Sequence, residues 1–397
     1  MCENKEQTVI VGNGTAAVEC FKTMRKYGYS GEIHVFAESD LPVYNPMLIS
    51  YYVAGKIPYE MMFPYGNDFS VFEENDVIFH QNTPIVKIEA NDKIIKCKTG
   101  TEYTFDKCLI ATGATPISPK FIGSASSKIY TMRTVQDAIR LKKRLKTLPA
   151  KVLVLGASMV GIKLVELFVN ADIRCVLADM APHVFPLSAS EECARFVEKK
   201  INSRGVSFRL SEALESIEDT PQGLRIWFNN SKIPEEVDLL LMCIGVNANT
   251  NIIDPNQIML DRGIIVNEKM ETSVENIYAA GDVAQGYNLL SRKQQILGLW
   301  ANARYQGQTA GANMAGIFKE YKGEIPHNIT HFLGMDFVGI GEVRDYDYSE
   351  KYVDGQQYSE IFYKEGKVCG ANLVNNIEES GILKSEIVKN YCSLQSL

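Results

Sequence analysis

The sequence lacks any apolar run approaching the roughly 20 residues that a membrane-spanning helix requires. Its first seven residues are polar and lead straight into an aliphatic stretch, so the apolar core of a secretory signal is missing. We therefore expect a cytoplasmic protein. An excess of positive charge is also missing, because the formal net charge is −7. This charge gives no support for binding to nucleic acid or to an anionic membrane.

Paired cysteines are absent as well. The chain has nine cysteines, an odd number, and no CxxC motif. This pattern argues against a disulfide framework, a thioredoxin-like dithiol and a zinc site, so we expect no metal. Cys108, Cys175 and Cys243 each stand within an aliphatic stretch and are interpreted as small buried hydrophobic residues. The five histidines are scattered and indicate no catalytic group.

Two glycine-containing motifs are the strongest positive signal in the 397 residues, which are enough for two or three domains. The first spans Val9 to Ala17 and the second Val152 to Gly161. In each, aliphatic residues predict a buried strand, and small residues predict a tight turn. Backbone N–H groups and the next helix N-terminus can then face a pyrophosphate. One motif alone also fits an ordinary turn, whereas two predict a relay between two redox cofactors.

The surroundings of both motifs support this interpretation. After the first come a predicted helix over residues 18–27, a strand over 32–36 and then Glu38. After the second come a helix over 162–170, a strand over 174–177 and then Asp179. An acid at the end of the second strand closes such a unit by binding the hydroxyl groups of an adenosine ribose.

The rest of the chain continues an α/β pattern and then changes character. Strands that end in small residues are predicted over 108–113, 237–245 and 276–282, with helices over 47–54, 134–147 and 297–314. After residue 325, alternating residues predict strands over 357–363 and 368–374, followed by a helix over 380–390.

In this order, the features resemble the FAD-dependent pyridine nucleotide–disulfide oxidoreductase superfamily over essentially the whole chain. The likeness is greatest to its single-flavin NADH reductases, namely rubredoxin reductases, ferredoxin reductases of oxygenase systems and the flavoprotein part of nitrite reductases. It is carried by Gly12 to Ala17 with Glu38, Ile110 to Gly113, Gly156 to Gly161 with Asp179, Cys243 to Gly245, and Ile277 to Asp282.

The resemblance implies an α/β fold with two Rossmann-like dinucleotide-binding domains and a small α+β C-terminal domain. The FAD-binding domain would be discontinuous, over 1–112 and 245–325. The NADH-binding domain would be inserted over 113–244, and the C-terminal domain would cover 326–397.

The resemblance also implies a set of cofactor-binding residues. Gly12, Gly14 and Ala17 would let the FAD pyrophosphate approach, and Glu38 would hold its ribose. Asp282 would bind the ribityl chain of the flavin, although an aspartate here also fits a helix cap or a turn. The full set is Gly12, Gly14, Thr15, Ala16, Ala17, Glu38, Asn45, Pro46, Thr112, Gly113, Gly156, Ser158, Met159, Val160, Gly161, Asp179, Gly245, Gly281 and Asp282.

Three departures from the family pattern bear on chemistry. The stretch from Met47 to Tyr52 has no cysteine, whereas disulfide-reducing relatives carry redox cysteines there. Asn45 stands where single-flavin relatives often have a basic residue. Lys163 stands where many relatives have an acid, so it either tunes the flavin–nicotinamide site or is a solvated helix residue.

We therefore predict an enzyme that takes hydride from NADH through FAD and passes electrons to a redox carrier, such as a rubredoxin, ferredoxin or iron–sulfur partner. Hydride transfer between these cofactors needs no side-chain acid or base. The alternatives are an NADH oxidase or another thiol-independent flavin reductase, and an NADH-sensing flavoprotein that binds a partner. A homodimer also fits.

Two further stretches are ambiguous. Residues 345–354 are acidic and aromatic and are predicted to form an exposed connecting loop rather than a docking site for a carrier. Residues 61–66 are apolar and loop-like, and they either cover the flavin or fill an interface.

Overall fold

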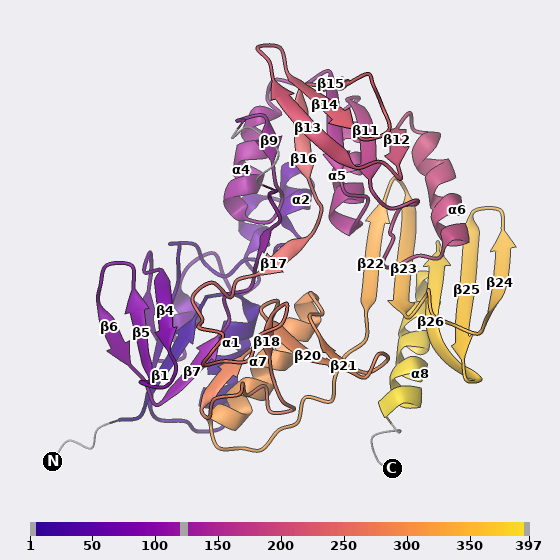
Figure 1. Ribbon diagram of the computed structural model, residues 1–397. Coiled ribbons are helices and arrows are strands. Elements are labelled where there is room, and N and C mark those ends of the chain that lie inside the picture. Colours follow the sequence, from indigo (N-terminus) through magenta and orange to yellow (C-terminus); the bar gives the residue numbers. More distant parts are fainter. Residues whose placement is uncertain (1–4, 120–125, 393–397) are drawn as a thin grey trace. The chain divides into compact units, whose positions relative to one another are not determined.

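A computed structural model describes residues 5–119 and 126–392 (Figure 1). The chain divides into two compact units, and each is described by itself. Unit 1 comprises Met1–Asn45, Pro58–Thr115 and Asn247–Glu324, and unit 2 comprises Pro46–Ile57, Pro116–Val246 and Ile325–Leu397. No helix in the described part of the chain is long and apolar enough to cross a membrane.

A five-stranded parallel sheet with the order β19-β7-β1-β2-β3 forms the centre of unit 1. Because all neighbours are parallel, the carboxyl ends of the strands share one edge. The central strands β1 and β7 are buried over nearly their whole length, which is typical of parallel strands covered on both faces. Their bounds are β1 (Gln7–Val11), β2 (Glu32–Phe36), β3 (Ile78–His80), β7 (Lys107–Ile110) and β19 (Ile277–Ala279).

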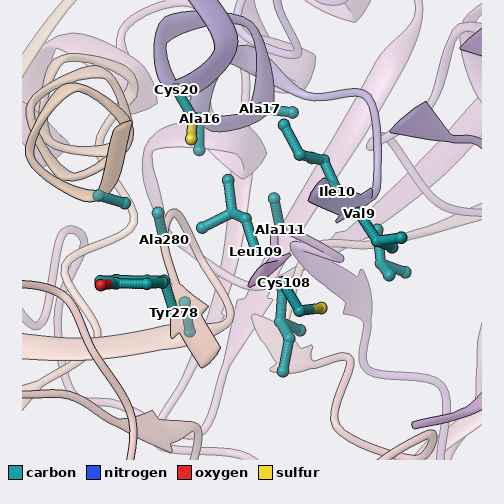
Figure 2. Close-up of a cluster of buried hydrophobic side chains, with 14 of the residues drawn as sticks. Val9, Ile10, Ala16, Ala17, Cys20, Cys108, Leu109, Ala111, Tyr278 and Ala280 are labelled. Carbon is teal, nitrogen blue, oxygen red and sulfur yellow. The ribbon is translucent and has the colours of Figure 1, made fainter. Parts of the chain in front are cut away.

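Two helices of unit 1, α1 (Thr15–Lys26) and α7 (Trp300–Met314), pack closely on each other. Gly307 and Gly311 permit this approach, because a β-carbon at either position would lie 2.3 Å from the carbonyl oxygen of Ala16 or Cys20. Figure 2 shows side chains of α1 facing those of β1, β7 and β19 in the core beneath.

Smaller elements complete unit 1. They are two three-stranded sheets, β4 (Ile85–Glu89), β5 (Ile94–Cys97) and β6 (Glu102–Thr104), and β18 (Ile264–Ile265), β20 (Ala284–Asn288) and β21 (Lys293–Gln295), with η1 (Tyr59–Met62) and α3 (Ser70–Glu73). The connecting strands β8 (Ala114–Pro116) and β17 (Val246–Ala248) pair with each other where the chain passes between units.

Unit 2 contains a second five-stranded parallel sheet with the order β12-β11-β10-β16-β9. A three-stranded antiparallel sheet accompanies it. The bounds are β9 (Ile129–Tyr130), β10 (Lys151–Leu155), β11 (Arg174–Asp179), β12 (Ser207–Leu210), β13 (Leu214–Asp219), β14 (Leu224–Phe228), β15 (Glu235–Val237), β16 (Leu239–Met242), α2 (Ile49–Val53), α4 (Val135–Arg144), α5 (Met159–Asn170) and α6 (Glu191–Asn202).

The C-terminal part of unit 2 is an antiparallel sheet with the order β22-β23-β26-β25-β24, and α8 packs on β26 and β23 (Figure 1). The Ser190 hydroxyl donates to Glu360 at 2.6 Å, and the Phe185 ring stacks on Phe337 at 4.3 Å, so this sheet is joined to the segment before α6. The bounds are β22 (His327–Phe332), β23 (Met335–Gly341), β24 (Tyr348–Asp354), β25 (Gln357–Lys364), β26 (Lys367–Val374), η2 (Ile377–Glu379) and α8 (Ser380–Cys392).

The α/β class, the parallel sheets and the small C-terminal α+β region agree with the sequence analysis. The predicted loop over 345–354 is wrong in one respect, because Tyr348–Asp354 forms the edge strand β24, paired with β25 and largely exposed. Residues 46–57 belong to unit 2, and residues 116–246 and 325–397 lie in one compact unit. The division into three functional domains stays a prediction.

The close contact of α1 and α7 gives a first prediction. Gly311→Ala should lower the free energy of unfolding by about 1–3 kcal/mol, because the added methyl overpacks the contact with Cys20. Gly381→Ala in α8 is the matched control, since a β-carbon there meets nothing within 4 Å. Urea unfolding followed by circular dichroism measures both variants. Equal midpoints for the two variants would contradict the proposed close packing.

Candidate functional site

The turn between β1 and α1 has the form that a bound pyrophosphate requires. Gly12 has φ +108°, and a β-carbon on it would lie 2.2 Å from the Ala111 carbonyl oxygen. A β-carbon on Gly14 would instead meet open space. The amides of Gly14, Thr15 and Ala16 donate to no acceptor in the described chain. They are the free donors of a helix N-terminus, which favour an anionic ligand.

The predicted residues of unit 1 lie together at the carboxyl edge of its parallel sheet. Gly12 follows β1, Glu38 follows β2, Thr112 follows β7 and Gly281 follows β19. A β-carbon on Gly281 would lie 3.4 Å from that of Ala16, so the turns after β1 and β19 adjoin. This edge is where open α/β sheets bind their ligands.

Glu38 and Asp282 reach this edge in different settings. Glu38 is exposed, just beyond the end of β2. Asp282 is half-buried in a turn that leads into β20, so the alternative of a helix cap is excluded and the turn remains.

A buried acid on α1 controls the orientation of Thr15. The Tyr65 hydroxyl donates to Glu19 at 2.9 Å and lies 2.7 Å from the Thr15 hydroxyl. Because the single Tyr65 hydrogen goes to Glu19, Thr15 must donate to Tyr65. The Thr15 hydroxyl hydrogen is therefore taken up by Tyr65, and the backbone amide is the donor that Thr15 leaves for a ligand.

The turn between β10 and α5 repeats the first one in unit 2. Gly156 has φ +109°, and a β-carbon on it would lie 2.3 Å from the Cys243 carbonyl oxygen. A β-carbon on Gly161 would lie 1.9 Å from the Gly156 oxygen, so the helix approaches the turn closely. The amides of Ser158, Met159 and Val160 donate to no acceptor in the described residues, and a dinucleotide fits this turn as it fits the first.

Asp179 ends β11 beside this turn and is held by the backbone. Its two oxygens accept from the Ala157 amide at 2.6 Å and the Ala181 amide at 2.8 Å. The carboxylate is therefore preorganised at the carboxyl edge of the second sheet, where the exposed Gly245 also follows β16.

The connecting strands are held by Asn249, which sequence analysis missed. Its side-chain amide donates to the Thr112 carbonyl at 2.8 Å, and its backbone amide donates to the Gly113 carbonyl at 2.9 Å. The Thr112 hydroxyl donates in return to the Asn249 carbonyl at 2.8 Å. Thr112 and Gly113 therefore have a fixed backbone geometry.

Asn45 and Pro46 stand where the chain passes from unit 1 into unit 2. The Asn45 amide donates to the Met62 carbonyl at 2.8 Å, and both of these residues belong to unit 1. Met62 and Phe63 are buried, whereas Met61 is exposed, so the stretch 61–66 buries two of its apolar residues.

Lys163 is not a solvated helix residue. Its side chain is 11% exposed, and its ammonium lies 2.7 Å from Glu166 and 4.5 Å from the centre of the Tyr51 ring. It also donates to the carbonyl of His331. The positive charge is therefore compensated within unit 2, and a role in tuning a flavin stays a prediction.

Glu166 is the centre of this group. It also accepts from Lys56 at 3.1 Å and from the Leu333 amide at 3.3 Å. Burial raises the pKa of the Glu166 carboxyl, but the hydrogen bonds and charges of Lys163 and Lys56 outweigh burial and hold that pKa below its ordinary value. The acid is therefore ionised at neutral pH.

The described cysteines are poorly suited to redox chemistry. Seven of them are buried, and only Cys392 is half-buried, while Cys2 lies outside the described residues. Burial raises the pKa of the Cys20 and Cys108 thiols, and it raises the pKa of Cys175 and Cys243 to about 12. Over residues 5–119 and 126–392, no group of three or more His, Cys, Asp or Glu side chains could hold a metal ion.

The pyridine nucleotide-disulphide oxidoreductase family matches residues 6–307. The rubredoxin-NAD(+) reductase of Pseudomonas putida is 27% identical over 382 residues, which cover 96% of this chain and 98% of that protein. The epsilon subunit of NADH-dependent phenylglyoxylate dehydrogenase from Aromatoleum evansii is 26% identical over 388 residues, covering 96% and 91%.

Among solved structures, the water-forming NADH oxidase from Lactobacillus brevis, bound to NADH, is similar with a TM-score of 0.90. The identity is 20%, and the likeness covers 97% of this chain and 91% of that one, so it demonstrates a common fold.

The Glu19 cluster gives a prediction about pH. Burial raises the pKa of Glu19, but hydrogen bonds from Gln308, Arg304 and Tyr65 outweigh it and lower the pKa. A lowered pKa contributes stability that is present above the unfolded pKa of about 4.3 and lost as pH falls through the folded pKa. Glu19→Gln should therefore cost about 1–3 kcal/mol at pH 7 and progressively less below pH 4.3.

Urea unfolding of the parent and the variant between pH 3 and pH 7 measures this effect. The exposed Glu236→Gln is the control and should follow the parent at every pH, because its side chain is 70% exposed. A gap between Glu19→Gln and the parent that stays constant across the range would show that Glu19 contributes no such pH dependence.

Proposed function

This chain belongs to the pyridine nucleotide-disulphide oxidoreductase family, and we propose that it takes hydride from NADH through FAD and passes the electrons to a redox carrier protein. The observation that carries the proposal is the pair of matching turns, Gly12 to Ala17 and Gly156 to Gly161, each at the carboxyl edge of a parallel sheet. Two such turns provide for two dinucleotides, and a relay needs both.

FAD is assigned to unit 1. The free amides of Gly14, Thr15 and Ala16 would hold its pyrophosphate, Glu38 its ribose and Asp282 the ribityl chain. The exposed setting of Glu38 leaves its carboxylate available to a hydroxyl group. Thr112 and Gly113, fixed by Asn249, would line the same edge.

NADH is assigned to unit 2. The amides of Ser158, Met159 and Val160 would hold its pyrophosphate, and Asp179 would accept from the ribose hydroxyl groups. The cofactors together supply hydride and electron transfer. The side chains of this protein supply binding, orientation and a fixed electrostatic environment, and no proton-transfer step is assigned to them.

A carrier is proposed as the acceptor because the similar protein of Pseudomonas putida is named a rubredoxin-NAD(+) reductase. The second candidate is an NADH oxidase, which the likeness to the water-forming NADH oxidase favours. An NADH-sensing flavoprotein that binds a partner is a further alternative. A homodimer is compatible with the proposal. The exposed strand β24, acidic and aromatic, is a candidate contact for a carrier.

The first test is turnover without accessible thiols. Holoprotein treated with N-ethylmaleimide should still transfer electrons from NADH to ferricyanide, since the described thiols near both turns are buried. Flavin content and circular dichroism check that the treated protein is intact. Loss of activity with both unchanged would require a thiol mechanism. If the protein consumes oxygen without a carrier as fast as it reduces a carrier, that result would favour the NADH oxidase.

The second test concerns the nucleotide. The parent should prefer NADH to NADPH, because the Asp179 carboxylate accepts from a free 2′-hydroxyl and repels a 2′-phosphate. Asp179→Asn keeps a side-chain acceptor and removes the charge, and it should narrow the ratio of the two kcat/KM values at least tenfold. The exposed Asp172→Asn, just after α5, should leave the ratio unchanged. Equal ratios in all three proteins would overturn the assignment.

A further inference from the structure

A cavity of about 270 Å³ lies in unit 2 between α2, the later part of α5 and the segment that follows α4. Its walls include Ser50 to Lys56 on one side and Lys163 to Ile173 on another. None of the residues assigned to NADH, from Gly156 to Gly161, Asp179 and Gly245, lines it. The cavity is therefore separate from the dinucleotide turn.

The polar end of the cavity carries one net positive charge. Glu166, with a side chain 6% exposed, lies 2.7 Å from Lys163 and 3.1 Å from Lys56. One carboxylate thus faces two ammonium groups. The negative charge of Glu166 is therefore compensated. One positive charge remains, and it can attract an anionic ligand.

The two lysines differ in the hydrogen bonds that remain open to them. Lys163 already donates to Glu166 and to the His331 carbonyl, and it lies over the ring of Tyr51. Within the described residues the Lys56 ammonium makes one hydrogen bond, to Glu166, and it lies 5.9 Å from the centre of the Tyr51 ring, with a side chain that is 40% exposed. Because an ammonium has three donors, Lys56 has two that can bind a ligand.

Most of the remaining wall is apolar, with Ser50 and Asn170 as polar exceptions. Leu145 and Leu148 follow α4, Leu167 and Phe168 belong to α5, and Ile173 precedes β11. Leu148 is 62% exposed, and a ligand that covers it would remove apolar surface from water.

We propose that this cavity binds a small organic anion with one carboxylate and a compact apolar body. The carboxylate accepts hydrogen bonds from Lys56, and the body packs on Leu148 and Leu167. The volume is slightly below the roughly 300–1,000 Å³ of drug-sized ligand sites, so it suits a molecule about the size of benzoate. Such a ligand bridges α2 and α5. The proposal does not depend on the identity of the electron acceptor.

The test uses the flavin-loaded protein with 4-fluorobenzoate and its neutral analogue 4-fluorobenzamide, followed by fluorine NMR line broadening. The acid should bind at least tenfold more tightly than the amide. Lys56→Met should lower the affinity for the acid at least tenfold and leave that for the amide unchanged. Lys146→Met is the matched control, because Lys146 is exposed, lies next to the lining Leu145 and does not line the cavity.

Leu148→Glu is a second variant, and it is expected to fold because residue 148 is exposed. The new carboxylate should repel 4-fluorobenzoate and lower the affinity for it at least tenfold. Equal affinity for acid and amide, or an equal loss in Lys56→Met and Lys146→Met, would overturn the proposal. Complete displacement of 4-fluorobenzoate by NADH would also overturn it, by placing the probe in the dinucleotide site. These binding results are independent of turnover with NADH, which is measured separately. Failure of this proposal is therefore distinguishable from failure of the proposed function.

Discussion

Close approach of two backbone segments, possible only without a β-carbon, is the constraint on which both candidate sites depend. At Gly12 and Gly156 the space for a β-carbon is taken by the carbonyl oxygen of Ala111 or Cys243, at 2.2 and 2.3 Å. The two φ angles, +108° and +109°, are nearly equal. A larger residue would push the neighbouring strand end away, and the first turns of α1 and α5 would no longer present their amides at the sheet edge.

Buried carboxylates fix the two helices that follow these turns. Glu19 on α1 is bound by Tyr65, Arg304 and Gln308, and Glu166 on α5 is bound by Lys56 and Lys163. Except for Lys163, which lies three residues from Glu166 on the same helix, the partners come from distant parts of the sequence. Removing one partner would leave a buried charge short of compensation, which is more costly than losing an exposed ion pair. These acids therefore hold distant segments in one arrangement within each unit.

The elements around both turns could be predicted because their signals are local: aliphatic runs, small residues at the turns, and an acid at the end of a strand. The contacts that hold the sites in place could not be predicted, because they join residues far apart in the sequence. The pairing of α2 with α5 depends on Lys56 meeting Glu166, 110 residues away. Asn249 holds Thr112 across 137 residues. The acidic and aromatic sequence of 345–354 predicts a loop, because the largely exposed strand β24 has no apolar alternation. Its pairing with β25 defines it as a strand.

Lys163 is not an isolated positive charge on α5, because Glu166 lies beside it. A charge whose counter-charge lies 2.7 Å away acts at a distance as a dipole, so its field falls more steeply than that of an isolated lysine. The lowered pKa of Glu166 keeps this pair ionised through neutral pH. Lys56 lies 3.1 Å from the same carboxylate, so the two lysines share one net positive charge. Lys56 is the more exposed of the two. An anion bound by Lys56, as proposed above, would compensate the one net charge that this cluster leaves.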